Sequence, residues 1–156
     1  MSASRVTDIY NYLRVDDKLV TSGQPSVEEL DAIARDGVEV VINLALHDDP
    51  RYSLPDESGS VEARGMDYIH IPVKFDAPTE EDLLAFFDAM EANRGRKLLV
   101  HCAANKRVTS FLGLYRVIRE RWDDQRAFEP MKEIWEPNPV WSSFISSMLA
   151  KHRSTS

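Results

Sequence analysis

Short apolar segments alternate with amphipathic segments along most of the chain, and this alternation limits the folds that it can adopt. The segment 38–46 is nearly continuous in β-branched and other apolar residues, as expected for a strand covered on both faces. Strands interleaved with helices predict an α/β fold with a mostly parallel central sheet flanked by helices. We expect strands at 18–22, 38–46, 68–72 and 97–101, and helices at 26–36, 79–95, 108–122, 125–135 and from 139 onward.

Capping signals indicate where three of these helices begin. Ser26 followed by Glu29 has the pattern of a capping box, and Thr79 with Asp82 indicates a second N-cap. Asn138 is expected to cap the last helix. The length of 156 residues suits one domain, so we expect a single domain over 1–156 with short flexible termini.

The stretch 47–60 is polar and has no helical or strand periodicity, so a surface loop is expected there. Its charged residues Asp48, Asp49 and Arg51 are candidates for the rim of a pocket. Three arginines of the helix 108–122 are expected to form a solvated face: Arg116, Arg119 and Arg121.

The composition indicates a folded protein without a general basic field. Hydrophobic residues make up 43% of the chain and charged residues 29%, which excludes extended disorder. Nineteen Lys and Arg against 26 Asp and Glu give a net charge of −7, so we expect no nucleic-acid binding and only a local anion site. The first twenty residues lack the pattern of a secretion signal, and no segment suits a membrane span, so no membrane partner is expected.

The chain has one cysteine, Cys102, which cannot form an internal disulfide and favours a reducing, cytoplasmic location. His47, His70 and His152 show no spacing with Cys102 or with carboxylates that would form a metal site. We therefore expect no metal and no organic cofactor.

The segment 100–109, with the sequence VHCAANKRVT, places Cys102 between an expected strand and an expected helix. Backbone N–H groups at such a junction have no intrahelical partners, and the helix dipole adds partial positive charge, so the junction favours phosphate or sulfate. The same field stabilises a thiolate, so Cys102 is predicted to be a nucleophile. Taken alone, a cysteine after an apolar strand is more often a small buried side chain.

Charged and polar neighbours of Cys102 complete the predicted anion site. Arg107 can fold its planar guanidinium back over the loop and bind two oxygens at once, which lysine cannot do. His101 is expected to be structural, either bonding the loop backbone or tuning the thiolate. The expected substrate-binding loop comprises Ala103, Ala104, Asn105, Lys106 and Arg107.

Four segments together resemble landmarks of the cysteine-dependent tyrosine and dual-specificity phosphatase superfamily, especially its small bacterial members. They are 21–25 (TSGQP), 41–44 (VINL), 69–73 (IHIPV) and 99–102 (LVHC). The resemblance implies a tyrosine-phosphatase-like fold in which Cys102 attacks phosphorus, Arg107 binds the phosphoryl oxygens, and the substrate is a phosphorylated protein or small molecule. It also implies that Asp76 protonates the leaving oxygen and then acts as a base. From the residues alone, Asp76 equally fits acidic enrichment at a helix start.

The chain departs from the family pattern at the loop. Four residues separate Cys102 from Arg107, where the family has five, which shortens the loop contour by up to about 3.6 Å. Asn105 stands where the family usually has glycine, and asparagine is one of the residues that tolerate positive φ. Val108 replaces the usual hydroxyl residue, and Thr109 is the candidate substitute.

The sequence supports three functions for this loop. The first is hydrolysis of a phosphate monoester through a cysteinyl-phosphate. The second is a sulfurtransferase that carries a persulfide on Cys102, because the four-residue spacing also resembles rhodanese loops. The third is a module that binds phosphate without cleaving it.

Overall fold

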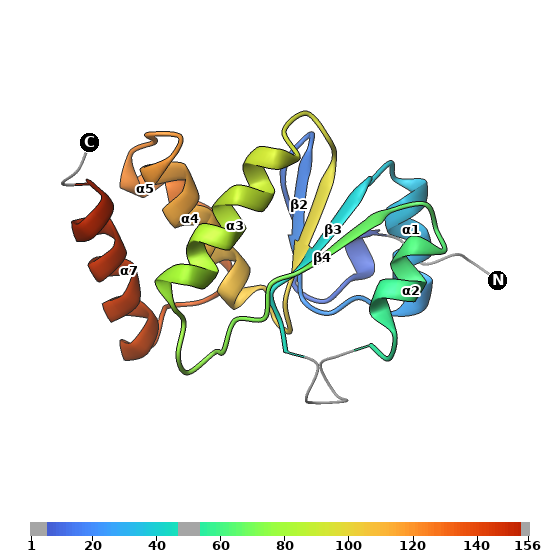
Figure 1. The fold of residues 1–156 in the computed structure, drawn as a ribbon, viewed down its shortest axis with the longest axis horizontal. Coiled ribbons are helices and arrows are strands. Elements are labelled where there is room, and N and C mark those ends of the chain that lie inside the picture. The colour runs from blue at the N-terminus through green and yellow to red at the C-terminus, as the bar shows by residue number, and fades with distance from the viewer. Residues whose placement is uncertain (1–5, 47–53, 154–156) are drawn as a thin grey trace.

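A five-stranded sheet with the order β1-β2-β5-β3-β4 forms the centre of the computed structural model, which describes residues 6–46 and 54–153 (Figure 1). β1 is antiparallel to β2, whereas the pairs β2–β5, β5–β3 and β3–β4 are parallel. The predicted mostly parallel α/β fold is therefore confirmed. The strands are β1 (Leu13–Asp16), β2 (Leu19–Ser22), β3 (Val40–Asn43), β4 (Asp67–His70) and β5 (Leu98–His101).

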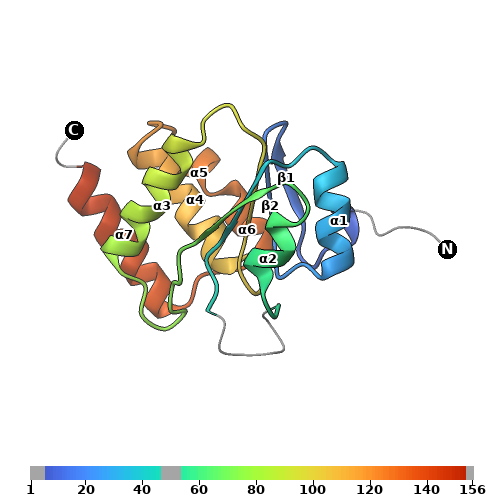
Figure 2. The same cartoon turned by 45° about the vertical axis from the view of Figure 1, so that its right-hand side comes forward.

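Helices cover both faces of the sheet. In Figures 1 and 2, α1 and α2 lie on one face, and α3, α4, α5 and α7 lie on the other. The sheet is thus the middle of three layers, and α6 packs against α4. The elements are the 3-10 helix η1 (Val6–Asp8) and the helices α1 (Val27–Arg35), α2 (Glu57–Glu62), α3 (Glu80–Ala92), α4 (Lys106–Ile118), α5 (Asp124–Ala127), α6 (Glu129–Ile134) and α7 (Pro139–Arg153).

The alternation of side chains along β5 divides the interior into two cores. Leu98 and Val100 belong to the core shared with α3, α4 and α7, whereas Leu99 belongs to the core beneath α1 and α2. The alternation continues at the end of the strand. His101 lies on the side of α2, where it contacts a residue of that helix, and Cys102 joins the core on the side of α4.

The capping predictions are confirmed. The Ser26 N–H donates to Glu29 Oε1 at 2.9 Å, and the Glu29 N–H donates to Ser26 Oγ at 3.2 Å. Thr79 Oγ1 accepts from the Asp82 N–H at 3.1 Å, and Asn138 Oδ1 accepts from a backbone N–H at 2.9 Å. These bonds satisfy donors that a helix leaves unpaired in its first turn.

The prediction of a surface loop over 47–60 is wrong for its last four residues. Residues 57–60 belong to α2, and Glu57 is buried because it pairs with a histidine of β5. Residues 47–53, with Asp48, Asp49 and Arg51, lie outside the described part of the chain.

The solvated helix face expected at Arg116, Arg119 and Arg121 is only partly confirmed, because Arg119 and Arg121 are exposed but lie beyond the end of α4. Arg116 is buried, and its guanidinium carbon lies 4.1 Å from the centroid of the Trp122 ring. Stacking on an indole allows arginine to lose water without losing all favourable contacts.

Several elements differ from expectation, and α4 both begins and ends earlier than the predicted 108–122. β3 covers only part of 38–46, and the edge strand β1 was not expected. The segment 125–135 is divided into α5 and α6 at Phe128, because Pro130 favours the first turn of a new helix over the interior of a longer one. No helix in the described ranges is long and apolar enough to cross a bilayer.

Candidate active site

Four parallel strands end at the same edge of the sheet, and the loops that follow them meet there. β5 lies between β2 and β3, so the segment 102–105, which links β5 to α4, occupies the middle of this edge. Ligands of open α/β sheets bind outside the carboxyl ends of the strands. The strand, loop and helix predicted around Cys102 are therefore present, in the position expected for a ligand site.

Asn105 gives this short loop its shape. Its φ of 66° is in the left-handed region, as predicted, directly before α4. Its Nδ2 donates to Thr21 Oγ1 and to the Asn11 carbonyl, both at 2.9 Å, and Asn11 Nδ2 donates to the Ala104 carbonyl at 3.0 Å. The loop backbone is thereby tied to β2 and to the segment before β1.

The residues after β2 approach the same loop closely. The Cys102 N–H donates to the Ser22 carbonyl at 3.3 Å, and the Gln24 N–H donates to the Ala103 carbonyl at 3.1 Å. A Cβ atom added at Gly23 would lie 2.6 Å from the Ala103 carbonyl oxygen, which is a steric clash. Glycine is therefore required at position 23 for this approach.

Cys102 directly follows β5. It is 1% exposed and belongs to the core on the side of α4. Helix α4 begins at Lys106, so the N–H groups of Lys106, Arg107 and Val108 have no carbonyl four residues earlier within the helix. The 13 residues of α4 direct the positive end of the helix dipole at the same place. The unpaired N–H groups and the helix dipole together favour an anion at this helix start.

Arg107 points inward and is only 8% exposed. Its Nη1 donates to the Val73 carbonyl at 2.7 Å, and its guanidinium carbon lies 5.8 Å from the centroid of the Phe75 ring. Among the described residues, no carboxylate forms an ion pair with Arg107. A buried guanidinium has five N–H donors, and most of them remain available for an anion.

Asp76 lies in an exposed turn that follows β4. The Ala77 N–H donates to the Lys74 carbonyl at 3.2 Å and closes the turn. Trp141 Nε1 donates to the Phe75 carbonyl at 2.7 Å, so α7 holds the residue before Asp76. The turn is connected to the candidate site by the Phe75 ring, which lies against the Arg107 guanidinium.

His101 is fully buried on the opposite side of the loop. Its Nδ1 lies 3.3 Å from the Cys102 carbonyl oxygen, and its Nε2 lies 2.5 Å from Glu57 Oε2. Sequence reasoning missed Glu57, because the polar segment around it carries no core pattern. The alternation along β5, which places His101 on the side of α2, was the only available signal.

The remaining predicted residues lie around the helix start. Thr109 Oγ1 is buried and donates to the Asn105 carbonyl at 2.9 Å, so its hydroxyl hydrogen supports the loop. Lys106 Nζ lies 5.5 Å from the centroid of the Trp135 ring, which also packs against Phe75. Trp135 therefore joins the aromatic side of the site, a role that the sequence did not reveal.

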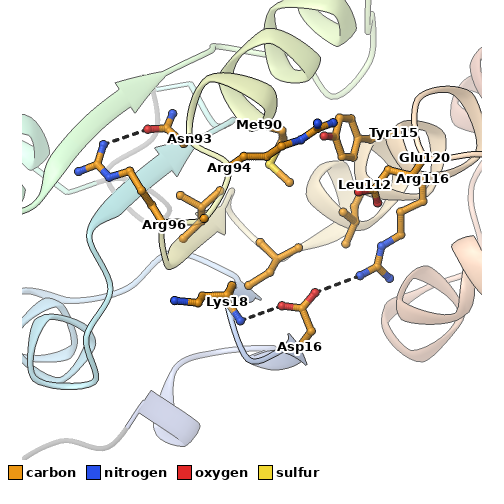
Figure 3. A pocket seen from close by; sticks show the side chains of 13 residues that line it. Asp16, Lys18, Met90, Asn93, Arg94, Arg96, Leu112, Tyr115, Arg116 and Glu120 are labelled. Atoms are coloured by element: carbon orange, nitrogen blue, oxygen red, sulfur yellow. Dashed lines mark hydrogen bonds and ion pairs between the residues drawn. The ribbon is translucent and has the colours of Figure 1, made fainter.

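A separate cavity of about 130 Å³ lies at the amino ends of β2 and β5, away from Cys102 (Figure 3). Burial lowers the pKa of Arg116 there, against the opposing effect of Asp16 at 3.6 Å. A hydrogen bond with Tyr115 raises the pKa of Arg94.

Within residues 6–46 and 54–153, no cluster of His, Cys, Asp and Glu could hold a metal ion.

This arrangement of sheet, cysteine loop and inward arginine defines the class of cysteine-based tyrosine and dual-specificity phosphatase-like proteins. Residues 5–137 match the family described as "DSP-PTPase phosphatase fused to NAD+ Kinase". The chain belongs to that family, as the resemblance predicted.

Two solved structures show the same fold. The DUF442 phosphatase candidate of Shewanella putrefaciens CN-32 is 32% identical, with a TM-score of 0.84 over 97% of this chain and 99% of that one. Tk-PTP in its active form is 24% identical, with a TM-score of 0.73 over 92% and 97% of the two chains.

A curated relative is much longer than this chain. The Beta-lactamase hydrolase-like protein of Xylella fastidiosa (strain Temecula1) is 32% identical over 109 residues, which are 69% of this chain and 25% of that protein. The match thus covers about a quarter of the relative.

Proposed function

We propose that the chain hydrolyses phosphate monoesters through a cysteinyl-phosphate on Cys102. The observation that carries the proposal is the buried Arg107 guanidinium, which has no acidic partner among the described residues and lies at the start of α4. A dianion beside Cys102 would supply the missing negative charge. Membership of a phosphatase family supports the same reaction.

The reaction has two steps. The Cys102 thiolate attacks phosphorus, an S–P bond forms, the P–O bond to the leaving group breaks, and Asp76 gives its proton to the leaving oxygen. Water then attacks phosphorus and loses a proton to Asp76, and the S–P bond breaks to restore the thiolate. The role of Asp76 is carried over from the family resemblance and is supported by the position of its turn beside Phe75 and Arg107.

Arg107 and the loop N–H groups stabilise the charge that develops on the phosphoryl oxygens. The guanidinium offers two parallel N–H donors, and the amides of the loop from Ala103 to Arg107 are fixed before the substrate arrives. These groups supply all the charge compensation that the proposal needs. We therefore expect activity without a metal or an organic cofactor, on a phosphorylated protein or small molecule.

Phosphate release from an aryl phosphate in the presence of a chelator tests this proposal. The wild-type chain should turn over, and Cys102→Ser should lose all turnover while its unfolding temperature stays close to that of the wild type. Arg119→Lys, at the exposed C-cap of α4, is the matched control and should keep full activity. Unchanged turnover in Cys102→Ser would exclude the mechanism.

A sulfurtransferase is the second candidate, favoured by the four-residue spacing between Cys102 and Arg107. It should form thiocyanate from thiosulfate and cyanide, and the mass of Cys102 should increase by one sulfur atom. Asp76→Asn should slow ester hydrolysis but not thiocyanate formation, because sulfur transfer needs no proton donor for an alkoxide. Phosphate binding without either activity would indicate a recognition module.

A further inference from the structure

A buried carboxylate lies behind the cysteine loop, on the face of the sheet opposite to Cys102. Glu57 is 1% exposed, although it opens the short polar helix α2. Its Oε2 lies 2.5 Å from His101 Nε2, and its Oε1 accepts from Gln24 Nε2 at 2.9 Å. Burying a carboxylate is costly unless its oxygens are hydrogen-bonded, and here both oxygens have partners.

The contacts of His101 fix the orientation of its ring. The Cys102 carbonyl can only accept, so Nδ1 carries a hydrogen and donates to it across 3.3 Å. One proton then lies between His101 Nε2 and Glu57 Oε2, and it is bound either to the nitrogen or to the oxygen. In both cases Glu57 holds the ring with Nδ1 directed at the Cys102 carbonyl.

Gln24 provides a second connection from Glu57 to the loop. Its side chain bonds Glu57, and its backbone N–H donates to the Ala103 carbonyl at 3.1 Å. Glu57 is thus linked to two consecutive loop carbonyls, that of Cys102 through His101 and that of Ala103 through Gln24.

Holding these carbonyls also directs two N–H groups. In a trans peptide the carbonyl of one residue and the N–H of the next point in opposite directions, and the described residues contain no cis peptide. When the carbonyls of Cys102 and Ala103 are held by His101 and Gln24, the N–H groups of Ala103 and Ala104 point away from those partners.

We propose that Glu57 is a positioning residue, which acts through His101 and Gln24 to turn the Ala103 and Ala104 N–H groups toward the substrate anion. It touches no reacting atom. The inference deepens the proposed function and rests on it for the identity of the anion, but it concerns anion affinity and not turnover.

Binding of inorganic phosphate to the full chain tests the inference, followed by NMR through the amide resonances of Ala103 and Ala104. Wild-type resonances should shift saturably. In Glu57→Ala the affinity should fall about tenfold, because two hydrogen-bonded connections worth about 1.4 kcal/mol in total are lost. Glu62→Gln, an exposed change in the same helix, is the matched control and should bind like the wild type.

Glu57→Gln is the second variant, in case the alanine variant does not fold. It keeps the shape but loses the charge, so its affinity should fall about threefold, since neutral hydrogen bonds are roughly half as strong as charge-assisted ones. Wild-type affinity in a folded Glu57→Ala, or in Glu57→Gln if only that variant folds, would overturn the inference. So would the absence of phosphate shifts at both amides of the wild type.

Failure of the proposed hydrolase and failure of the positioning role of Glu57 give different results. If the wild type binds phosphate and loses affinity in Glu57→Ala but hydrolyses no ester, the positioning role stands and the hydrolase is wrong. If esters are hydrolysed and both Glu57 variants bind like the wild type, the hydrolase stands and the positioning role is wrong.

Discussion

The two sides of the Cys102 loop are built in different ways. On one side, His101, Glu57 and Asn105 are buried and hold the loop backbone through several hydrogen bonds. On the other side, Asp76 lies on an exposed turn, and α7 holds that turn through the Phe75 carbonyl. Under the proposed mechanism, anion binding would depend on the buried, hydrogen-bonded side of the loop and proton transfer on the exposed turn.

This difference can be tested by the kind of substrate that each variant affects. Changes on the buried side should weaken the reaction of every phosphate ester, because all of them share the phosphoryl group. Changes in the Asp76 turn should affect mainly esters whose leaving group needs a proton.

The largest effect is expected for Arg107→Lys. A point ammonium cannot form the two parallel hydrogen bonds of a guanidinium, so turnover should fall by about 10²-fold or more for good and poor leaving groups alike. Steady-state kinetics with two aryl phosphates measure this, with Arg119→Lys as the control. A loss confined to poor leaving groups would mean that Arg107 assists proton transfer to the leaving group and does not bind the phosphoryl group.

Asp76→Asn should separate the two sides most clearly. Hydrolysis of an alkyl phosphate should fall by about 10²-fold, whereas an ester with an acidic phenol should lose much less in its first step. Asp82→Asn, in the first turn of α3, is the matched control for the loss of a negative charge. Equal losses with both esters would assign Asp76 to positioning only.

Gly23→Ala should damage the buried side without removing any polar group. The new methyl group would meet the Ala103 carbonyl, so the loop must shift, and we expect a loss of about 1–3 kcal/mol in unfolding free energy with lower turnover of every ester. Denaturant unfolding and phosphate release measure the two effects. Wild-type stability together with wild-type turnover would show that the loop tolerates displacement.

Trp141→Phe should affect the exposed side by a smaller amount. It removes the hydrogen bond from Nε1 to the Phe75 carbonyl and keeps most of the ring packing, so stability should fall by about 1–2 kcal/mol. Turnover of poor leaving groups should decrease more than that of good ones. A uniform decrease would mean that α7 supports the whole site.

Glu80→Gln is expected to have the smallest effect, because Glu80 has no part in the proposed mechanism. A hydrogen bond from Lys151 lowers the pKa of the Glu80 carboxyl, with a smaller contribution from His152. The stabilisation is complete above the ordinary carboxyl pKa of 4.5 and is lost as the pH falls below it. The unfolding temperatures of wild type and variant should therefore converge at acid pH, with unchanged turnover at neutral pH.

The sequence predicted the parts of the fold that depend on local chemistry. The strands and helices follow from the periodicity of apolar residues, the Ser26 and Thr79 caps from side chains that bond their own helix start, and the positive φ of Asn105 from the tolerance of asparagine for that region. The helix after Cys102 was also predicted, although it begins at Lys106 and not at Val108. These features need no knowledge of distant residues.

The missed features depend on contacts between segments far apart in the chain. Glu57 is buried because His101 and Gln24 surround it, and nothing in its polar neighbourhood indicates this. Phe75 is fixed by Trp141 of the last helix. Arg116 is removed from solvent by Trp122, so its charge alone gave the wrong prediction.

The most direct test of the central claim is to trap the intermediate. Asp76→Asn slows the attack of water, so an acid quench during turnover of an aryl phosphate with a good leaving group should leave a phosphoryl group on Cys102, detected by mass spectrometry of its peptide. We predict nearly one phosphoryl group per chain, and none in the Asp76→Asn variant that also carries Cys102→Ser. Sustained turnover with an unmodified Cys102, or a phosphoryl group on another residue, would contradict the account.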